Sequence, residues 1–383
     1  MLLNLTTGAS LLIAGTTIGA VTLALPIATA KIGLLGVLIL FLSAWMVMYI
    51  SGLILAEVCI NYPPGTSFVT LAKNNFGYIG QLIAWVSYGV LLITLLMAYF
   101  SSLSSLIDFN NVFFDDRRIG NTLVALVVWL VVSMGTEFID AMNRLMVYVL
   151  VVTIVLMMMV LFMHTNHSPW LTIKPTISGM GHLLPIIVAG FGFQVILPSV
   201  RTYLNGHEER LPNAVLYGSL LPLIIYIFWT VGVLIGLKQK DLLELAQFSD
   251  ETVAISVLLQ SLVHRFIINL FIFAAVVSSL LGIALSLKDF ITDAFKMKSN
   301  WLPSLLTVLI PWMIVNIHPA AFLEILRFGG FIVAILNILF PSLILLKERM
   351  RYGPSHQLIA PSNGVVYGVI IYAVFVIFAE IFY

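Results

Sequence analysis

Charged residues are scarce in this chain of 383 residues: only 9% are Asp, Glu, Lys or Arg, while 61% are hydrophobic. A soluble globular domain carries about 25% charged residues. So few charges cannot cover the surface of a soluble protein of this length, which argues against that class. The net charge of +1 gives no basic surface for nucleic acid, so we expect no such partner.

Cysteine is nearly absent as well. Cys59 is the only one, so the chain can form no intramolecular disulfide and has no cysteine cluster for a metal. The seven histidines have no spacing to another metal ligand on one helix face. The sequence contains no Ser/His/Asp pattern, HExxH motif or carboxylate pair. We therefore expect neither an enzyme nor a cofactor or metal, apart from a coupling ion.

Long apolar runs fill most of the chain. A bilayer core of about 30 Å needs about 20 apolar residues per helical crossing, and backbone amides in lipid must be satisfied internally. Strands of a membrane barrel would alternate polar and apolar residues, which these runs do not. We predict an all-α integral membrane protein, one transporter domain over 1–383, with eleven transmembrane helices near residues 8–30, 33–57, 79–107, 120–137, 142–163, 181–203, 213–237, 257–287, 302–317, 321–346 and 364–382.

The segments between these runs predict the orientation. Residues 1–7 contain no Lys or Arg and no cleavage pattern follows, so we interpret the first run as a retained helix, not a signal peptide. With the N-terminus inside, the inside loops hold ten Lys or Arg residues, among them Arg201, Lys288 and Lys347, against six outside. Eleven helices then place the C-terminus outside. We also expect a short interfacial helix within 58–78, a polar segment at 238–255 and a cytoplasmic linker at 347–363.

Glycine interrupts two of the apolar runs near their centres. The first motif is Ala14-Gly15-Thr16-Thr17-Ile18-Gly19-Ala20 and the second is Ala189-Gly190-Phe191-Gly192-Phe193-Gln194, and a proline follows each, Pro26 and Pro198. Glycine costs about 1 kcal/mol relative to alanine inside a helix. A single such motif more often serves close helix packing, and Gly15 and Gly19 form a GxxxG pair. Two matching interruptions instead suggest discontinuous helices 1 and 6 in an inverted repeat of about 8–163 and 181–346, followed by an extra helix at 364–382.

Unwound segments in a membrane expose amide groups that lipid cannot satisfy. The N–H groups at a half-helix N-terminus can bind a carboxylate, and freed carbonyls can hold an ammonium group or a cation. The middle of the bundle has almost no ionisable residues, which fits a zwitterion better than a charged substrate. We expect the substrate pocket at Gly15, Thr16, Thr17, Gly19, Gly190, Phe191, Gly192, Phe193 and Gln194.

Each side chain in this set has an alternative structural role. The Thr16 and Thr17 hydroxyls can bond to their own helix instead of a ligand. Phe191 and Phe193 can stack on an aromatic ligand or face lipid. Gln194 can bind a ring hydroxyl or an indole N–H, or simply a neighbouring helix.

The two motifs resemble helices 1 and 6 of the hydroxy/aromatic amino acid permease family, within the amino acid–polyamine–organocation superfamily. The likeness continues through Leu25-Pro26 and Pro198-Ser199, and the closest members are the tyrosine- and tryptophan-specific permeases. Further stretches match in the family's order: Leu71-Ala72-Lys73, Asn143-Arg144, Tyr226-Ile227-Phe228-Trp229 and Leu281-Gly282-Ile283-Ala284-Leu285.

The resemblance implies the two-repeat fold of the bacterial leucine transporter, in a bacterial inner membrane with a periplasmic C-terminus. It implies an ion-coupled symporter in the lipid bilayer that imports an aromatic amino acid, tyrosine before tryptophan or phenylalanine. The sequence leaves the oligomeric state open, and we favour a monomer. By analogy with that fold, Tyr88, Thr94 and Tyr99 on helix 3 join the expected pocket. A serine/threonine symporter of the same fold is the alternative. A channel or a membrane-embedded enzyme fits less well, because a continuous polar stripe and a catalytic constellation are missing.

The coupling ion is open between proton and sodium. The aromatic branch is described as proton-driven, but Leu150 stands where the tyrosine permease carries a lysine in helix 5. Ser278 and Ser279 fall where sodium-coupled relatives place a hydroxyl pair, and hydroxyl and carbonyl oxygens suit a hard cation. The candidate ion-coupling residues are Ala14, Thr17, Ser278 and Ser279.

Overall fold

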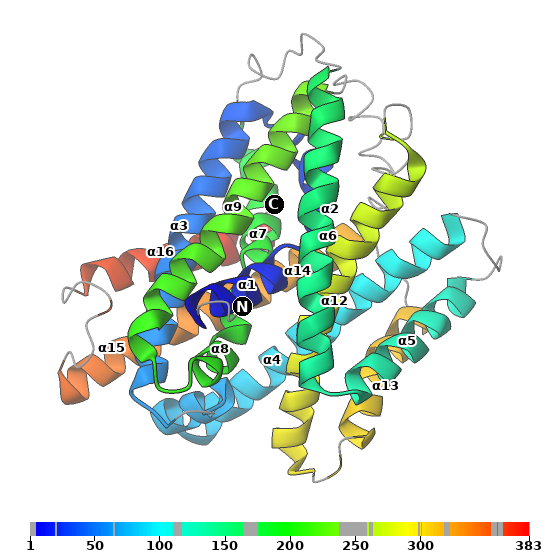
Figure 1. Cartoon of the computed structure of the whole chain (residues 1–383). Helices are drawn as coiled ribbons and strands as arrows, with labels where there is room; N and C mark the ends of the chain where they lie inside the picture. The colour runs from blue at the N-terminus through cyan, green and yellow to red at the C-terminus, as the bar shows by residue number, and fades with distance from the viewer. Residues whose placement is uncertain are drawn as a thin grey trace.

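A computed structural model shows the chain as a bundle of α-helices (Figure 1). The residues that it describes are 5–19, 21–63, 66–109, 117–163, 175–236, 259, 263–297, 299, 301–317, 322–353, 358 and 363–382. No strand occurs among them, so the all-α class is confirmed for this part of the chain.

The helical elements follow one another along the chain with short 3₁₀ and π turns between some of them. Their bounds are α1 Leu5–Thr17, α2 Val21–Thr29, α3 Gly33–Ile60, α4 Phe68–Phe109, α5 Arg117–Ser133, α6 Thr136–Met163, α7 Ile177–Gly190, η2 Phe193–Ile196, α8 Leu197–Leu204, η3 Glu208–Arg210, α9 Leu211–Gly236, α12 Arg265–Phe295, α13 Trp301–Ile317, α14 Phe322–Val333, η4 Ala334–Leu339, α15 Phe340–Tyr352 and α16 Gly364–Phe382.

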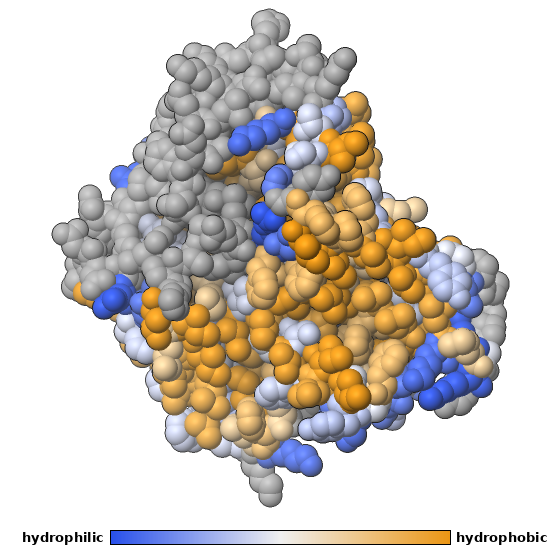
Figure 2. All heavy atoms as spheres, turned by 180° about the vertical axis from the view of Figure 1, so that it is seen from behind, coloured by the Kyte–Doolittle hydropathy of each residue, from blue (hydrophilic) through white to orange (hydrophobic). Residues whose placement is uncertain are grey.

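The lengths and surfaces of these helices are those of a multi-pass membrane protein. Within the described ranges, eight helices are long and apolar enough to cross a membrane, and the bent pair α1 and α2 makes up to nine. Helices α5 and α13 are apolar but shorter. Figure 2 shows a broad apolar area on one face, with hydrophilic residues gathered at its lower right margin, as a lipid-facing surface requires. The count of eleven transmembrane helices stays a prediction.

Three cations that were counted with the inside loops lie on helices and have polar partners. Helix α12 runs past the predicted end at 287, so Lys288 is helical and buried, and its Nζ donates to the carbonyl of Val132 at 3.2 Å. Arg201 is buried in α8 and pairs with Glu208 at 2.6 Å. Lys347 lies on α15 and donates to a backbone carbonyl of α4. Each helix continues because the charged group finds a polar partner within the protein, which hydropathy alone does not reveal.

The predicted interfacial helix within 58–78 corresponds to the first turns of α4. Gly77, at φ 68° and ψ −155°, then turns the chain before the long part of α4. That positive φ favours glycine. Helix α6 begins earlier than predicted, so Glu137 lies in its first turn, where a carboxylate favours the helix dipole. The segment 238–255 falls outside the described residues.

Contacts between helices join distant parts of the sequence. Helix α1 packs on α9 and α7 packs on α3. Helix α12 packs on α6, while α4 packs on α14. The last helix, α16, lies against α7 and the π turn η4. These contacts enclose the two glycine motifs within the bundle.

One close contact between helices gives a test of this packing. A Cβ atom on Gly330 of α14 would overlap the backbone carbonyl of Pro185 in α7. Because backbone cannot move aside as a side chain can, we expect Gly330→Ala to lower the free energy of unfolding by about 1–3 kcal/mol. A Cβ atom on Gly368 of α16 would meet no atom within 4 Å. Gly368→Ala is therefore the matched control, and its free energy of unfolding should be unchanged or slightly higher. Thermal unfolding in detergent measures both, and equal melting temperatures would contradict this packing.

Candidate functional site

The first glycine motif breaks its helix only in the second half of the motif. Helix α1 continues to Thr17, and the chain then leaves helical geometry at Ile18 and Gly19 before α2 begins, with a bend of 54° between the two helices. Of the two glycines in this motif, only Gly19 lies in the break. Gly15 is helical and faces α6, where an added Cβ would lie 2.8 Å from the amide nitrogen of Asn143. Gly15 thus serves close packing, the alternative that the GxxxG spacing left open.

The second motif breaks its helix directly after Gly190. Helix α7 ends at Gly190, Phe191 and Gly192 are not helical, and the 3₁₀ turn η2 leads from Phe193 into α8. The N–H of Phe193 donates to the carbonyl of Phe191 at 2.9 Å, a tight turn that ends the α-helical bonding pattern. Pro198 lies in the first turn of α8, where its missing N–H costs no helical hydrogen bond.

The threonine hydroxyls of the first motif bond to their own helix. Thr17 Oγ1 donates to the carbonyl of Ile13 at 2.7 Å, and Thr16 Oγ1 donates to the same carbonyl at 2.8 Å. The methyl group of Thr16 faces Gly282 of α12, where an added Cβ would lie 2.7 Å away. In this structure, therefore, the backbone of α1 takes up the hydroxyls that we expected to be available to a ligand.

Tyr226 of α9 connects the two breaks. Its hydroxyl lies 2.6 Å from the carbonyl of Thr17 and 2.9 Å from that of Gly190, so the one proton serves both acceptors. Trp229, one turn further along α9, donates from its indole N–H to the carbonyl of Thr22 at 2.7 Å. Sequence analysis missed both residues as part of the site. The available signal was a pair of aromatic side chains with polar tips, spaced i, i+3 in an apolar helix.

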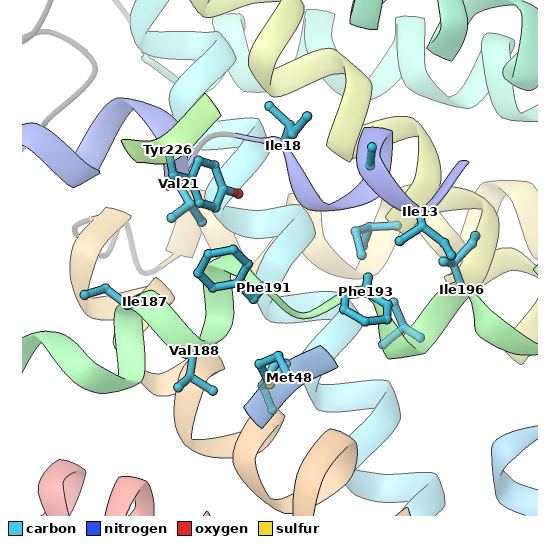
Figure 3. Packing of buried hydrophobic residues seen from close by; sticks show 14 of the residues in the cluster. Ile13, Ile18, Val21, Met48, Ile187, Val188, Phe191, Phe193, Ile196 and Tyr226 are labelled. Carbon is cyan, nitrogen blue, oxygen red and sulfur yellow. The ribbon is translucent and has the colours of Figure 1, made fainter. Parts of the chain in front are cut away.

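The two phenylalanines of the second motif point into the protein. Phe191 and Phe193 are fully buried, so the lipid-facing alternative is wrong for both. The ring of Phe191 packs edge-on against Tyr226 with centroids 5.2 Å apart, and Figure 3 shows the two rings together beside Val21. Phe193 lies against α3, where a Cβ on Gly52 would come within 2.6 Å of its ring. Apolar side chains thus fill the space between the breaks.

Buried polar atoms without partners surround this packed centre. Among the described residues, Gln194 Oε1 and Asn337 Nδ2 have no hydrogen-bond partner. The other end of the Gln194 amide donates to the carbonyl of Met48 in α3 at 3.0 Å. An unsatisfied buried polar atom costs about 1–3 kcal/mol. A polar ligand between the breaks would satisfy such atoms.

Asn337 is a site candidate that the sequence analysis also missed. It lies in the π turn η4, and a Cβ on Gly192 would come 3.7 Å from its amide nitrogen. The hydroxyl of Ser51 in α3 donates to the backbone carbonyl of Asn337. Single π turns within α-helices are frequent at functional sites. An asparagine within the apolar run 321–346 was the signal available in the sequence.

The predicted serine pair lies on α12 beside the first break. Ser278 Oγ donates to the carbonyl of Ile18 at 3.2 Å. Ser279 is fully buried and so close to Gly19 that a Cβ on Gly19 would overlap its hydroxyl. One carbonyl and two hydroxyls give a group of oxygen donors that suits a hard cation.

The oxygens of the other two ion-coupling candidates, Ala14 and Thr17, already take part in hydrogen bonds within the protein. The Ala14 carbonyl accepts the N–H of Ile18 at 2.8 Å, and the Thr17 hydroxyl points to its own helix. Leu150 is fully buried in α6. Within the described ranges, no three His, Cys, Asp or Glu residues come together to hold a metal ion.

The three helix 3 candidates lie at different levels along α4. Thr94 and Tyr99 are buried, and Tyr99 lies next to Ser279 at the first break. Tyr88 lies further from the breaks and reaches the end of the second one, with its hydroxyl 3.4 Å from the carbonyl of Val195. It also lines a cavity of about 260 Å³. The structure thus brings Tyr99 to the first break, whereas Tyr88 lines a cavity at the end of the second.

Comparison with known proteins finds similarity along the whole chain. The model of the tryptophan/tyrosine permease family matches residues 4–380. The tryptophan-specific transport protein of Haemophilus influenzae is 26% identical over 98% of this chain and 95% of that protein. The tyrosine-specific transport system 1 of the same organism is 27% identical, covering 91% and 90%. The low affinity tryptophan permease of Escherichia coli is 27% identical, covering 89% and 87%.

Proposed function

Because this chain belongs to the tryptophan/tyrosine permease family, we propose that it is an ion-coupled symporter that imports an aromatic amino acid by alternating access. The proposed location is a bacterial inner membrane, with a cytoplasmic N-terminus and a periplasmic C-terminus. The family consists of permeases, which confirms the prediction that the chain is not an enzyme. We propose a monomer as the working unit.

The observation that carries the proposal is the meeting of both helix breaks at one hydroxyl. The carbonyls of Thr17 and Gly190, from opposite halves of the chain, both point at Tyr226 Oη. An ammonium group carries three donors and can take both carbonyls in place of the single hydroxyl. The N-terminus of α2, which begins at Val21, can supply amide groups for the carboxylate. The ammonium group of a zwitterion would thus bridge the two breaks, and its carboxylate would be bound at the first.

The polar atoms near the second break favour tyrosine among the aromatic amino acids. Gln194 Oε1 is an acceptor and Asn337 Nδ2 is a donor, and neither has a partner among the described residues. A phenol hydroxyl donates and accepts, whereas an indole N–H only donates. Phe191 and Phe193 give the ring apolar surroundings. We therefore propose tyrosine as the preferred substrate, with tryptophan and phenylalanine after it.

The helix contacts support the inverted repeat, which we propose within one domain and the fold of the bacterial leucine transporter. If helices 1–5 correspond to helices 6–10, α1 corresponds to α7 and α3 to α9. The contact of α1 with α9 then has its counterpart in that of α7 with α3. The contact of α12 with α6 has its counterpart in that of α4 with α14. Halves related by a two-fold axis in the membrane plane produce such reciprocal contacts.

The coupling ion stays open between proton and sodium within the proposal. Ser278, Ser279 and the Ile18 carbonyl are the residues that would hold a sodium ion, because their oxygens lie together at the first break. Bound there, a cation would contact the same break as the substrate ammonium site. That arrangement would couple the two binding events through the geometry of one unwound segment.

Uptake into proteoliposomes tests this function. We expect labelled tyrosine to accumulate only under an imposed proton or sodium gradient, and the gradient that drives it identifies the ion. Unlabelled tryptophan and phenylalanine should compete better than serine, threonine or glutamine. Competition by serine but not by aromatic amino acids would favour the serine/threonine alternative, and a linear, unsaturable flux would favour a channel. No gradient-driven uptake of any aromatic amino acid would refute the proposal.

A further inference from the structure

The cavity that Tyr88 lines begins where the second break ends. It has a volume of about 260 Å³, close to the lower end of the range for small-molecule sites. It lies between α4, α8 and α12, whose ends gather in the lower part of Figure 1. Val195 of the turn η2 forms part of its wall, and the Tyr88 hydroxyl donates to the carbonyl of Val195. The cavity thus lies beside the end of the second break, on the side of the bundle that we predict to be cytoplasmic.

Aromatic rings form one side of this cavity. Tyr88 stacks on Phe68 with ring centroids 6.3 Å apart, and it meets Phe290 at 5.3 Å with the ring planes tilted by 58°. Tyr88 and Phe290 are each half-buried, so their rings remain accessible from the cavity. Rings in these orientations can accept a further aromatic ring beside them.

A single unpaired carboxylate completes the wall. Asp289 of α12 is exposed, and no residue in the described part of the chain forms a hydrogen bond or an ion pair with it. The Nζ of its neighbour Lys288 donates to the carbonyl of Val132. The other polar side chains of the wall are the hydroxyls of Ser67, Ser199, Thr202 and Ser286. The wall therefore carries a negative charge, and the residues that line it include no cation.

We propose that this cavity is a second binding site, in which Asp289 binds the ammonium group of an aromatic substrate while Tyr88 and Phe290 hold its ring. An ammonium–carboxylate contact is charge-assisted and stronger than a contact between neutral groups. The aromatic nature of the substrate rests on the proposed function. A substrate that leaves the two breaks on the cytoplasmic side meets this cavity next, so the site is a station on the release path.

The charges of the wall predict a selectivity that separates this site from the one between the breaks. The lining has no cation to pair with the substrate carboxylate, so the cavity should also bind an aromatic amine that lacks one. The site between the breaks uses helix amides for the carboxylate and should discriminate against such an amine. Tyramine, which keeps the ring and the ammonium group of tyrosine, is therefore a selective probe of the cavity.

Calorimetric titration of the purified full-length protein with tyramine tests the proposal. We expect Asp289→Asn, which keeps the size of the side chain, to weaken tyramine binding by about tenfold or more. Glu137→Gln is the matched control, because Glu137 is an exposed acid at the start of α6 outside the cavity, and it should bind like the wild type. Phe290→Ala retains the carboxylate and removes one ring, and it should also weaken binding.

Two results would overturn the second site: no tyramine binding to the wild type, or wild-type affinity in both Asp289→Asn and Phe290→Ala. If Asp289→Asn does not fold, the Phe290→Ala titration decides alone. The outcome is separable from that of the proposed function. Tyramine binding that depends on Asp289, without any tyrosine uptake, would refute the symporter and leave the site standing. Tyrosine uptake with tyramine binding insensitive to both variants would do the reverse.

Discussion

Arg349→Met is expected to lower the free energy of unfolding by about 3–5 kcal/mol, the range for removing one partner of a buried ion pair. Arg349 of α15 and Glu57 of α3 lie 2.8 Å apart, and their side chains are only 5% and 1% exposed. The substitution removes the guanidinium group that pairs with the buried Glu57 carboxylate. The loss is larger than at a surface pair, where water screens the charge that remains.

The surroundings of this ion pair increase the expected effect. Glu348, the preceding residue of α15, accepts hydrogen bonds from Asn61 at 2.8 Å and from Asn75 at 3.3 Å. Asn75 in turn donates to the hydroxyl of Tyr62 at 2.8 Å. The ends of α3, α4 and α15 are therefore held by one polar network. If Arg349→Met shifts α15, it disturbs the whole network.

Thermal unfolding in detergent measures this effect, and the same helix offers a matched control. Arg351 lies exposed in the last turn of α15, so Arg351→Met should change stability by no more than about 0.5 kcal/mol. Replacing Glu57 and Arg349 together by apolar residues should recover much of the loss, because no lone charge then stays buried. Equal melting temperatures for Arg349→Met and Arg351→Met would contradict the buried pair.

The sequence located the helices and the second break because their signals are local. An apolar run of about 20 residues marks a crossing by itself. The pair Gly190 and Gly192 in such a run weakens the helix where it stands. Gly15 shows the limit of this reasoning, since it carries the same local signal as Gly19. Only the position of Asn143 on α6 decides that Gly15 packs within a helix while the chain breaks further on.

Partners that lie far away in the sequence could not be predicted from it. Glu324 stands three residues before Arg327, and this i, i+3 spacing predicts a pair on one helix face. Arg327 instead pairs with Glu380 of α16 at 2.8 Å, while the side chain of Glu324 falls outside the described residues. Tyr226 is a similar case: it matched the family only as part of a helix 7 motif. Its role at the two breaks depends on how α9 packs against α1.

Tyr226→Phe is the second substitution with a large expected effect, and it acts on uptake. It removes one hydroxyl from a buried ring and deprives the carbonyls of Thr17 and Gly190 of their shared donor. A buried acceptor without a partner costs about 1–3 kcal/mol, and about 1.4 kcal/mol corresponds to a factor of ten. We expect the initial rate of tyrosine uptake to fall by about fivefold to a hundredfold. The packing against Phe191 should remain, because the ring stays.

When no substrate is bound, the Tyr226 hydroxyl holds the two unwound segments at the distance at which one ammonium group can bridge them. Without the hydroxyl, two carbonyls face each other with no donor between them, and the segments are expected to separate or to rotate toward other donors. Substrate binding would then have to restore that geometry, and this cost would appear as weaker binding and slower uptake.

Tyr217→Phe makes the same chemical change on the same helix and serves as the control. Tyr217 is 57% exposed on α9, so loss of its hydroxyl should leave uptake unchanged. Both variants are compared with the wild type at equal protein content in proteoliposomes, with melting temperatures recorded alongside. If Tyr226→Phe imports tyrosine as fast as Tyr217→Phe does, the hydroxyl only fills space between the breaks. The Thr17 and Gly190 carbonyls would then not form the ammonium site.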